Sequence, residues 1–322
     1  MRKLLLGTTA LAAAATLTAN AALADVSISG AFEWSYNSRS SNIVAEDGTE
    51  FGTDSSITIG FTNKTDSGLD IGYTQAIDTD GAALGNNENS LSIGGGFGKI
   101  ILGHNDAAAD AYIIDESDLI AEDQAPVQAS ASIGTSSSMA LAQGDNNKIT
   151  YHLPAMGGLT AGISHTDSGE TGASDSTSMG AKYSMAAAGA AITLGYATTT
   201  TDNSAQDIDS STMGMKIVSG DISMIISQGK YEASGEDHDN MGASISYKVS
   251  DVMTIGAYTF DSENDSVAGE EYARSGAEVA YTIASGLTAV LNVDDYDYKV
   301  GTNSSTVADS GTNSSLTIKA SF

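Results

Sequence analysis

Apolar and polar side chains alternate along most of this chain, a pattern typical of β-strands whose two faces meet different surroundings. In the clearest run, apolar side chains occupy every second position except Gly30: Val26, Ile28, Phe32, Trp34 and Tyr36. The positions between them are mainly polar. Similar runs recur toward the end of the chain, for example in residues 192–196, 287–293 and 316–322. The alternation predicts a protein built almost entirely of half-apolar strands.

Short turns separate these strands at a nearly constant interval. The residue just before each following run is Gly68, Gly98, Gly158, Gly189, Gly220, Asp251 or Gly286. The gaps between these markers are 30, 60, 31, 31, 31 and 35 residues. An interval of ~31 residues fits one β-hairpin plus a longer connection, so the seven turns predict about 16 antiparallel strands. The doubled gap predicts one long insertion.

The apolar face must contact either a second sheet or lipid. Strands of ~10 residues cross a hydrocarbon layer when tilted, and short turns at one end with longer loops at the other are typical of outer-membrane barrels. Five lysines fall on the polar parity of their strands: Lys148, Lys182, Lys216, Lys248 and Lys319. That placement also suits a half-solvated sandwich, and the last strand, described below, favours lipid. We predict an all-β fold, a closed antiparallel transmembrane β-barrel with short periplasmic turns and long extracellular loops.

Residues 1–24 have the composition of a secretory signal peptide. Arg2 and Lys3 form a basic start, residues 4–17 are mainly apolar, and Ala22-Leu23-Ala24 fits the small-x-small cleavage rule. We expect cleavage after Ala24, export of the protein, and a barrel formed by residues 25–322.

Charge and cysteine content exclude several kinds of chemistry. Beyond Arg2 and Lys3, 11 basic side chains stand against 41 acidic ones, which disfavours nucleic-acid binding. The chain has no cysteine, so it has neither disulfides nor a Cys-ligated zinc site. Its histidines lack metal-ligand spacing. Acidic clusters such as Asp261/Glu263/Asp265 do not complete a Ca²⁺-loop pattern, so we expect no cofactor beyond weakly bound Ca²⁺.

Two blocks and the last strand carry a family resemblance. The last run of alternation ends on Phe322, a terminal aromatic that resembles the assembly signal of outer-membrane barrels. The blocks LSIGGGFGKIILGHND (residues 91–106) and NNKITYHLPAMGGLTAGISHT (residues 146–166) resemble strand-turn-strand segments of Rhodobacter-like alphaproteobacterial porins. The chain thus resembles a general diffusion porin of the Gram-negative outer membrane.

This resemblance implies a channel for passive diffusion of ions and small hydrophilic solutes. It also implies a homotrimer in contact with the lipid bilayer and lipopolysaccharide, and a closed sheet in which Asp25 lies near Phe322. The long insertion, residues 105–146, corresponds to the porin loop that folds into the barrel and narrows it. The candidate constriction residues are its carboxylates: Asp106, Asp110, Asp115, Glu116, Asp118, Glu122 and Asp123.

The candidate pore wall departs from the family pattern. Related porins face the acidic loop with arginines, whereas this chain has Glu33 and His104 at two of those positions. The remaining candidate wall residues are Lys148, Lys182 and Lys216. Because fixed negative charge concentrates cations in a narrow passage, we expect a cation-selective pore.

Two other functions must be weighed against a channel. Some outer-membrane barrels are hydrolases, but Ser164 and His165 are adjacent and point to opposite faces of a strand, so they cannot form a catalytic pair directly. We therefore expect no enzymatic activity. A secreted β-rich adhesin or structural protein would show the same alternation without forming channels.

Overall fold

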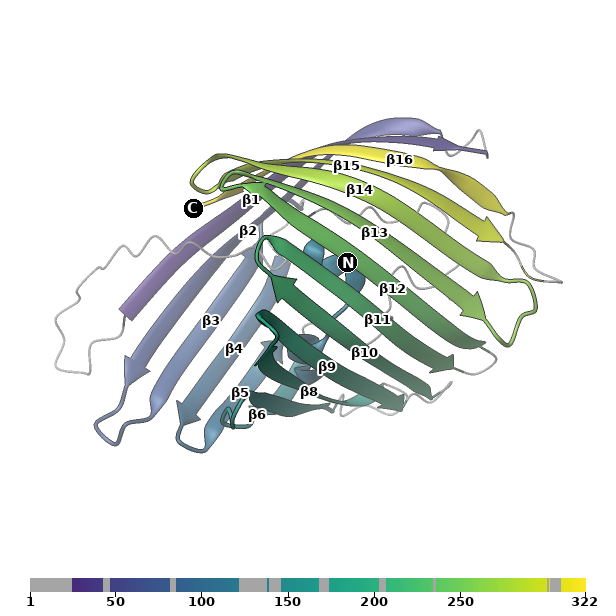
Figure 1. Ribbon diagram of the computed structural model, residues 1–322. Helices are drawn as coiled ribbons and strands as arrows, with labels where there is room; N and C mark the ends of the chain where they lie inside the picture. The colour runs from purple at the N-terminus through teal and green to yellow at the C-terminus, as the bar shows by residue number, and fades with distance from the viewer. Residues whose placement is uncertain are drawn as a thin grey trace.

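The computed structural model describes residues 25–42, 47–81, 85–121, 138, 146–167, 174–202, 207–233, 236–299, 301 and 308–322. Sixteen antiparallel strands within these ranges form one closed barrel in which β1 pairs with β16 (Figure 1). This confirms the predicted fold class. The strands are β1 (Asp25–Ser41), β2 (Gly48–Lys64), β3 (Asp70–Asp78), β4 (Gly85–Gly95), β5 (Gly98–Asn105), β6 (Asn146–His152), β7 (Leu159–Thr166), β8 (Asp175–Ala187), β9 (Ala190–Asp202), β10 (Ile208–Ser219), β11 (Ile222–Ala233), β12 (Glu236–Ser250), β13 (Met253–Asn264), β14 (Glu271–Ala284), β15 (Leu287–Lys299) and β16 (Asp309–Ser321).

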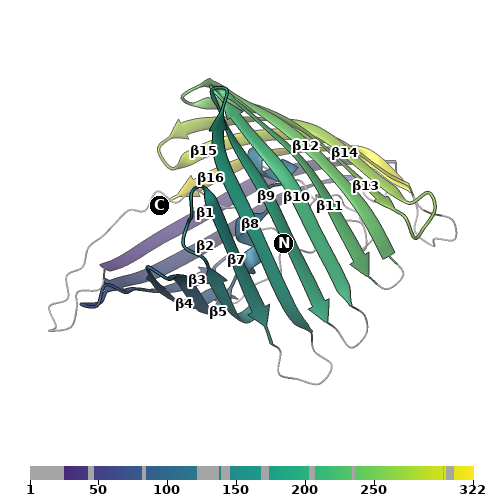
Figure 2. The same cartoon turned by 60° about the horizontal axis from the view of Figure 1, so that its bottom comes forward.

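The turns that contain the predicted markers all lie at one end of the barrel, and the connections that follow the odd-numbered strands lie at the opposite end (Figure 2). The predicted glycine markers adopt positive φ angles, for example Gly189 (φ 81°) between β8 and β9 and Gly286 (φ 75°) between β14 and β15. Glycine has no β-carbon to clash in this left-handed region, which explains its recurrence. The turn before β13 contains Asp251 instead, and the strand register shifts there, between Lys248 and Ser250.

The two faces of the barrel wall differ as the alternation predicts. Large apolar side chains on the outside are strongly exposed, such as Tyr196 (50%), Ile226 (54%) and Leu291 (51%). Inward neighbours such as Thr199 and Asn292 are polar. A continuous apolar outer belt of this kind would be unstable in water and is suited to hydrocarbon.

The first and last strands close the barrel through backbone hydrogen bonds. Phe322 N–H donates to the Gly30 carbonyl (2.9 Å), and Gly30 N–H donates to the Phe322 carbonyl (3.2 Å). Asp25 instead pairs with Thr62 on β2. The expected closure is therefore present, but Phe322 lies opposite Gly30 and not beside Asp25, because β1 extends five residues before that point.

Aromatic side chains gather on the outer face of β1 and β2. The ring centroids of Trp34 and Phe51 are 5.5 Å apart in a stacked arrangement, and those of Tyr36 and Phe51 are also 5.5 Å apart. Such a cluster suits the boundary between lipid headgroups and hydrocarbon, where Trp and Tyr bodies are buried while their polar atoms reach water.

Candidate functional site: the loop inside the barrel

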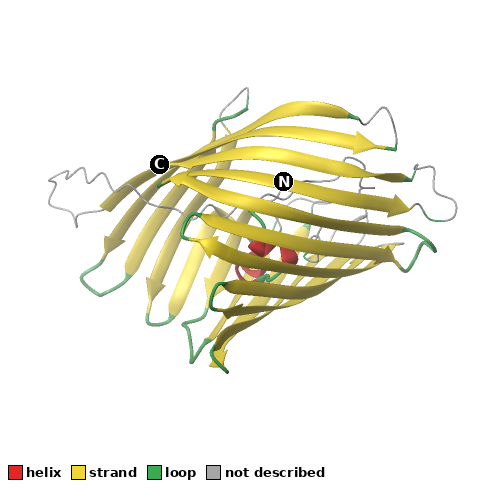
Figure 3. Ribbon diagram, turned by 45° about the horizontal axis from the view of Figure 1, so that its top comes forward, coloured by secondary structure: helices red, strands yellow, loops and turns green. Residues whose placement is uncertain are grey.

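The segment after β5 turns into the interior of the barrel. It contains two short 3₁₀ helices, η2 (Ala108–Tyr112) and η3 (Glu116–Leu119), which Figure 3 draws in red within the ring of strands. Two backbone amides of η2 donate hydrogen bonds to the inward hydroxyls of Ser164 on β7 (2.8 Å) and Ser178 on β8 (2.9 Å). The second helix, η3, contacts β11, β12 and β13. The loop thus follows the inner wall from β7 to β13.

Neither helix of this loop resembles a membrane span. Among the residues that the structure describes, no helix is long and apolar enough to cross a membrane.

Inward-facing glycines make room for the loop. A β-carbon at Gly180 would lie 2.7 Å from the β-carbon of Tyr112, and one at Gly195 would lie 2.9 Å from the Ile114 side chain. At Gly214 a β-carbon would overlap the carbonyl oxygen of Ile114. Real β-carbons essentially never come within 3.0 Å of such atoms. Together these positions form a glycine path on which the loop is seated.

Two of the candidate constriction carboxylates fasten the loop. Buried Asp115 caps the first turn of η3, where its carboxylate accepts a hydrogen bond from Ser117 N–H (3.0 Å). Buried Glu116 accepts one from the Ser227 hydroxyl on β11 (3.0 Å), and its carboxyl group occupies the space beside Gly242. Both side chains therefore bind the loop or the wall, and neither is exposed in the lumen.

Asp118, by contrast, is exposed. The surrounding loop and wall still remove enough water to raise the pKa of its carboxyl to about 6, and the nearby charge of Asp115 acts in the same direction. The charges of Lys182 and Lys216 on the wall oppose this and lower the pKa. Asp118 is therefore an acidic group of the lumen with wall lysines nearby.

The other candidate loop residues are placed differently. Asp106 and Asp110 are half-buried, and Asp110 lies within electrostatic range of Lys182. Glu122 and Asp123 lie outside the described residues. A constriction role for these carboxylates stays a prediction.

Four of the five candidate wall residues lie on the inward parity of their strands. Lys148 on β6 is buried, and Lys182 and Lys216 face the loop from β8 and β10. Glu33 forms an ion pair with Lys319 of β16, with 3.3 Å between its Oε2 and the Lys319 Nζ. This pair was not expected from the sequence. The strand register places the two residues directly opposite each other across the β1–β16 seam.

His104 is the exception among the candidate wall residues. It lies opposite Asn89 on β4 and Asn147 on β6, at the same parity as exposed Leu102. The structure therefore places it on the outer face, contrary to the prediction. The alternation of Ile100, Leu102 and His104 already carried this information, which the family position of the histidine overrode.

A second inner cluster lies on the other side of the barrel and was missed by the sequence analysis. Arg274 on β14 is fully buried and pairs with Asp294 on β15, with 3.3 Å between Nε and Oδ2. Its guanidinium also donates to the Tyr258 hydroxyl (3.0 Å) and lies 5.2 Å from the Tyr258 ring centroid. A buried arginine with such partners is not a mobile cation of the pore wall.

Four buried aromatic side chains extend this cluster along the inner face of β13–β15: Phe260, Tyr272, Tyr296 and Tyr298. The Tyr298 hydroxyl donates to Glu270 (2.8 Å), and the Tyr296 hydroxyl donates to Asp309 (3.0 Å). The signal in the sequence was the alternation of Tyr296 and Tyr298 with Asp295 and Asp297, in which the aromatic residues lie at the opposite parity to the outward Leu291 and Val293.

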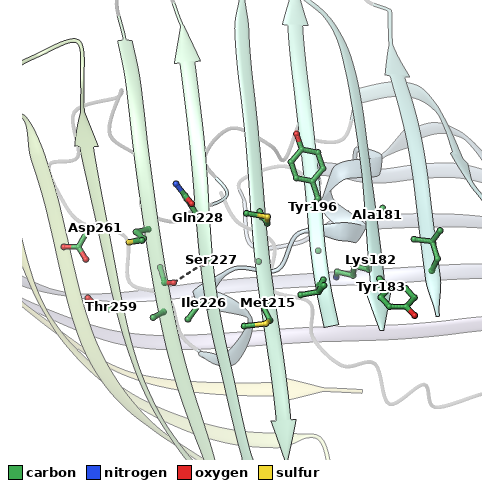
Figure 4. A pocket seen from close by; sticks show the side chains of 18 residues that line it. Ala181, Lys182, Tyr183, Tyr196, Met215, Ile226, Ser227, Gln228, Thr259 and Asp261 are labelled. Carbon is green, nitrogen blue, oxygen red and sulfur yellow. Dashed lines mark hydrogen bonds between the residues drawn. The ribbon is translucent and has the colours of Figure 1, made fainter. Parts of the chain in front are cut away.

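The outer side of the loop-bearing wall has a groove of its own. It has a volume of about 620 Å³ and is lined mainly by outward apolar side chains such as Tyr196, Met215 and Ile226 (Figure 4). Because these residues belong to the outer belt, the groove is not part of the passage.

Within the described ranges, no group of three or more His, Cys, Asp or Glu side chains is arranged to hold a metal ion.

Comparison with solved structures gives porins as neighbours. An anion-selective porin from Comamonas acidovorans has 17% identity and a TM-score of 0.69, and the match covers 93% of this chain and 100% of that one. In-vitro-folded OmpT, an outer membrane protein of Vibrio cholerae, has 14% identity and a TM-score of 0.71, covering 96% and 100%. A mutant of the Rh. blastica porin has 18% identity and a TM-score of 0.66, covering 92% and 100%. These identities establish the shared fold only.

The family comparison reaches further. No curated protein matched the chain. The sequence profile described as "Gram-negative porin" matches residues 7–306, which is most of the chain. Together with the sixteen-stranded barrel and the loop inside it, this match shows that the chain belongs to the Gram-negative porin family, the general diffusion porins of the outer membrane.

Proposed function

We propose that this porin forms a water-filled, cation-selective channel for ions and small hydrophilic solutes. The observation that carries the proposal is the placement of exposed carboxylates on both the loop and the wall of β1–β3. Asp118 is exposed on the loop, and Asp54 is exposed on β2 opposite Glu33. Asp54 also lies within electrostatic range of Asp78 and Asp80. Fixed negative charge of this kind raises the local concentration of cations.

Several inward basic side chains are paired or lie elsewhere on the wall. Lys319 is paired with Glu33, and Arg274 is buried with Asp294. Lys148, Lys182 and Lys216 face inward from β6, β8 and β10, on the part of the wall that the loop covers. Arg39 faces inward from β1 near its connection to β2. The Comamonas neighbour is described as anion-selective. Since that protein shares the fold at 17% identity, the fold leaves selectivity open and the lining charges must decide it.

Reversal potentials across a planar bilayer under a KCl gradient test this proposal. We expect potassium to be preferred over chloride, and Asp54→Asn and Asp118→Asn to reduce that preference because each removes one lumen charge. Asp66→Asn, in the exposed turn between β2 and β3, removes the same charge outside the lumen and serves as the control. A chloride preference of the wild-type channel would refute cation selectivity.

We further propose that the protein is exported to the outer membrane and assembles there as a homotrimer, as the family resemblance implies. Residues 1–24, which lie outside the described residues, would act as the signal peptide. Trimer formation is supported by a Vibrio cholerae neighbour solved in a trimer form. Contact with lipopolysaccharide stays a prediction. Native mass spectrometry of detergent-extracted protein tests the trimer.

Weak Ca²⁺ binding by the acidic loops stays a prediction. Isothermal titration calorimetry that shows no heat of Ca²⁺ binding would contradict it.

A further inference from the structure

Just after η3, the backbone of the internal loop at Ala121 is held by two side chains of opposite charge. Glu278 on β14 accepts a hydrogen bond from Ala121 N–H (2.7 Å). Lys319 on β16 donates one to the Ala121 carbonyl oxygen (2.5 Å). Hydrogen bonds with one charged partner are about twice as strong as neutral ones. We refer to these two contacts as the Ala121 clamp.

The clamp is joined to the seam that closes the barrel. The Lys319 ammonium also lies 3.3 Å from the Glu33 carboxylate on β1, and both side chains are largely shielded from water. One ammonium therefore connects the loop, the last strand and the first strand. Its charge acts in these contacts and is not free to attract anions.

The Ala121 clamp connects different strands from the contacts that position the rest of the internal loop. Between β7 and β13 the loop is positioned by the glycine path and by hydrogen bonds that each join it to one strand, including the Glu116–Ser227 contact. The Lys319 ammonium instead joins the loop to the seam between β1 and β16. Ala121 is where the chain has passed η3 and reaches β14 and β16.

We propose that Lys319 and Glu278 are the positioning residues that hold the internal loop in its open-channel position. The proposal rests on the channel function proposed above and adds which residues fix the passage. Loss of either contact frees the backbone at Ala121 to move into the lumen, so the open channel becomes unstable without a loss of the barrel.

Single-channel recordings of four variants test the clamp. Lys319→Met removes the donor, and Glu278→Leu removes the acceptor. We expect both to increase the frequency of closing events by about tenfold, the change that corresponds to a lost hydrogen bond with a charged partner. Lys319→Arg keeps a charged donor and Glu278→Gln keeps an acceptor oxygen, so both variants should stay close to the wild type.

Lys299→Met is the matched control. Lys299 is an exposed β15 residue paired with Glu271 (2.6 Å), so its replacement makes the same charge change away from the loop. The resistance of the folded barrel to detergent before boiling checks that each variant is assembled. If Lys319→Met fails to assemble, Glu278→Leu and Glu278→Gln carry the test.

A second measurement reports the loop directly. The chain has no cysteine, so Ala121→Cys introduces a single thiol. We expect a water-soluble thiol reagent to label it about tenfold faster when Lys319→Met is added, and not when Lys299→Met is added. A wild-type protein that forms no channels would refute the proposed function. A conducting wild type, with clamp variants equally quiet and the introduced thiol labelled at an unchanged rate, would refute the clamp alone.

Discussion

At the scale of single residues, Gly214 shows how a missing side chain determines the shape of the pore. A β-carbon there would overlap the Ile114 carbonyl, and because these atoms belong to the loop backbone, the loop itself would have to move. We expect Gly214→Ala to displace the loop, to change single-channel conductance, and to lower the free energy of unfolding by about 1–3 kcal/mol, as overpacking does. Gly48→Ala, on β2 with nothing within 4 Å of its added carbon, should change neither quantity. Equal conductance of the two variants would contradict the glycine path.

Asp118 makes a prediction about pH at the same scale. Its pKa of about 6 is raised above the ordinary carboxyl value, so the carboxyl loses its charge as the pH falls through that value. Potassium preference should therefore decrease between about pH 8 and pH 5, where unperturbed carboxylates stay ionised. Reversal potentials measured across this range check it. Asp118→Asn should show a smaller change, and an undiminished change in that variant would assign the titration to another group.

The residue scale also shows what the sequence left undetermined. Asp115 and Asp118 are three residues apart in the same acidic segment, yet one caps a helix and the other is exposed. Irregular backbone has no period from which side-chain direction can be read, so the family resemblance and the acidic composition placed both in the constriction. Gly180, Gly195 and Gly214 were visible as glycines on the polar parity of consecutive strands. These glycines indicate a packing contact only once a segment of the chain is known to lie against them.

At the scale of elements, the strands were predictable because two independent signals agree. Alternation gives the face of each side chain, and positive-φ glycines such as Gly189 mark where the chain must reverse. The loop between β5 and β6 was predictable in position, because its length breaks the 31-residue interval. Its attachment to the wall was not, since Glu278 and Lys319 are more than 150 residues away from Ala121 along the chain.

At the scale of the whole molecule, the closed sheet and its apolar belt must supply the stability that disulfides provide elsewhere. Ile226 lies in the outward row of β11 between Met224 and Gln228 and is 54% exposed to the surroundings of the barrel. In lipid, Ile226→Arg should lower the free energy of unfolding by ~2–4 kcal/mol, because a charge near the midplane must leave water. Thr74→Lys, at an inward position of β3, adds a charge that the aqueous lumen can hydrate and should cost far less. Denaturant unfolding in liposomes compares the two. Equal costs would mean that the outer belt does not contact hydrocarbon, and the membrane orientation of the barrel would have to be abandoned.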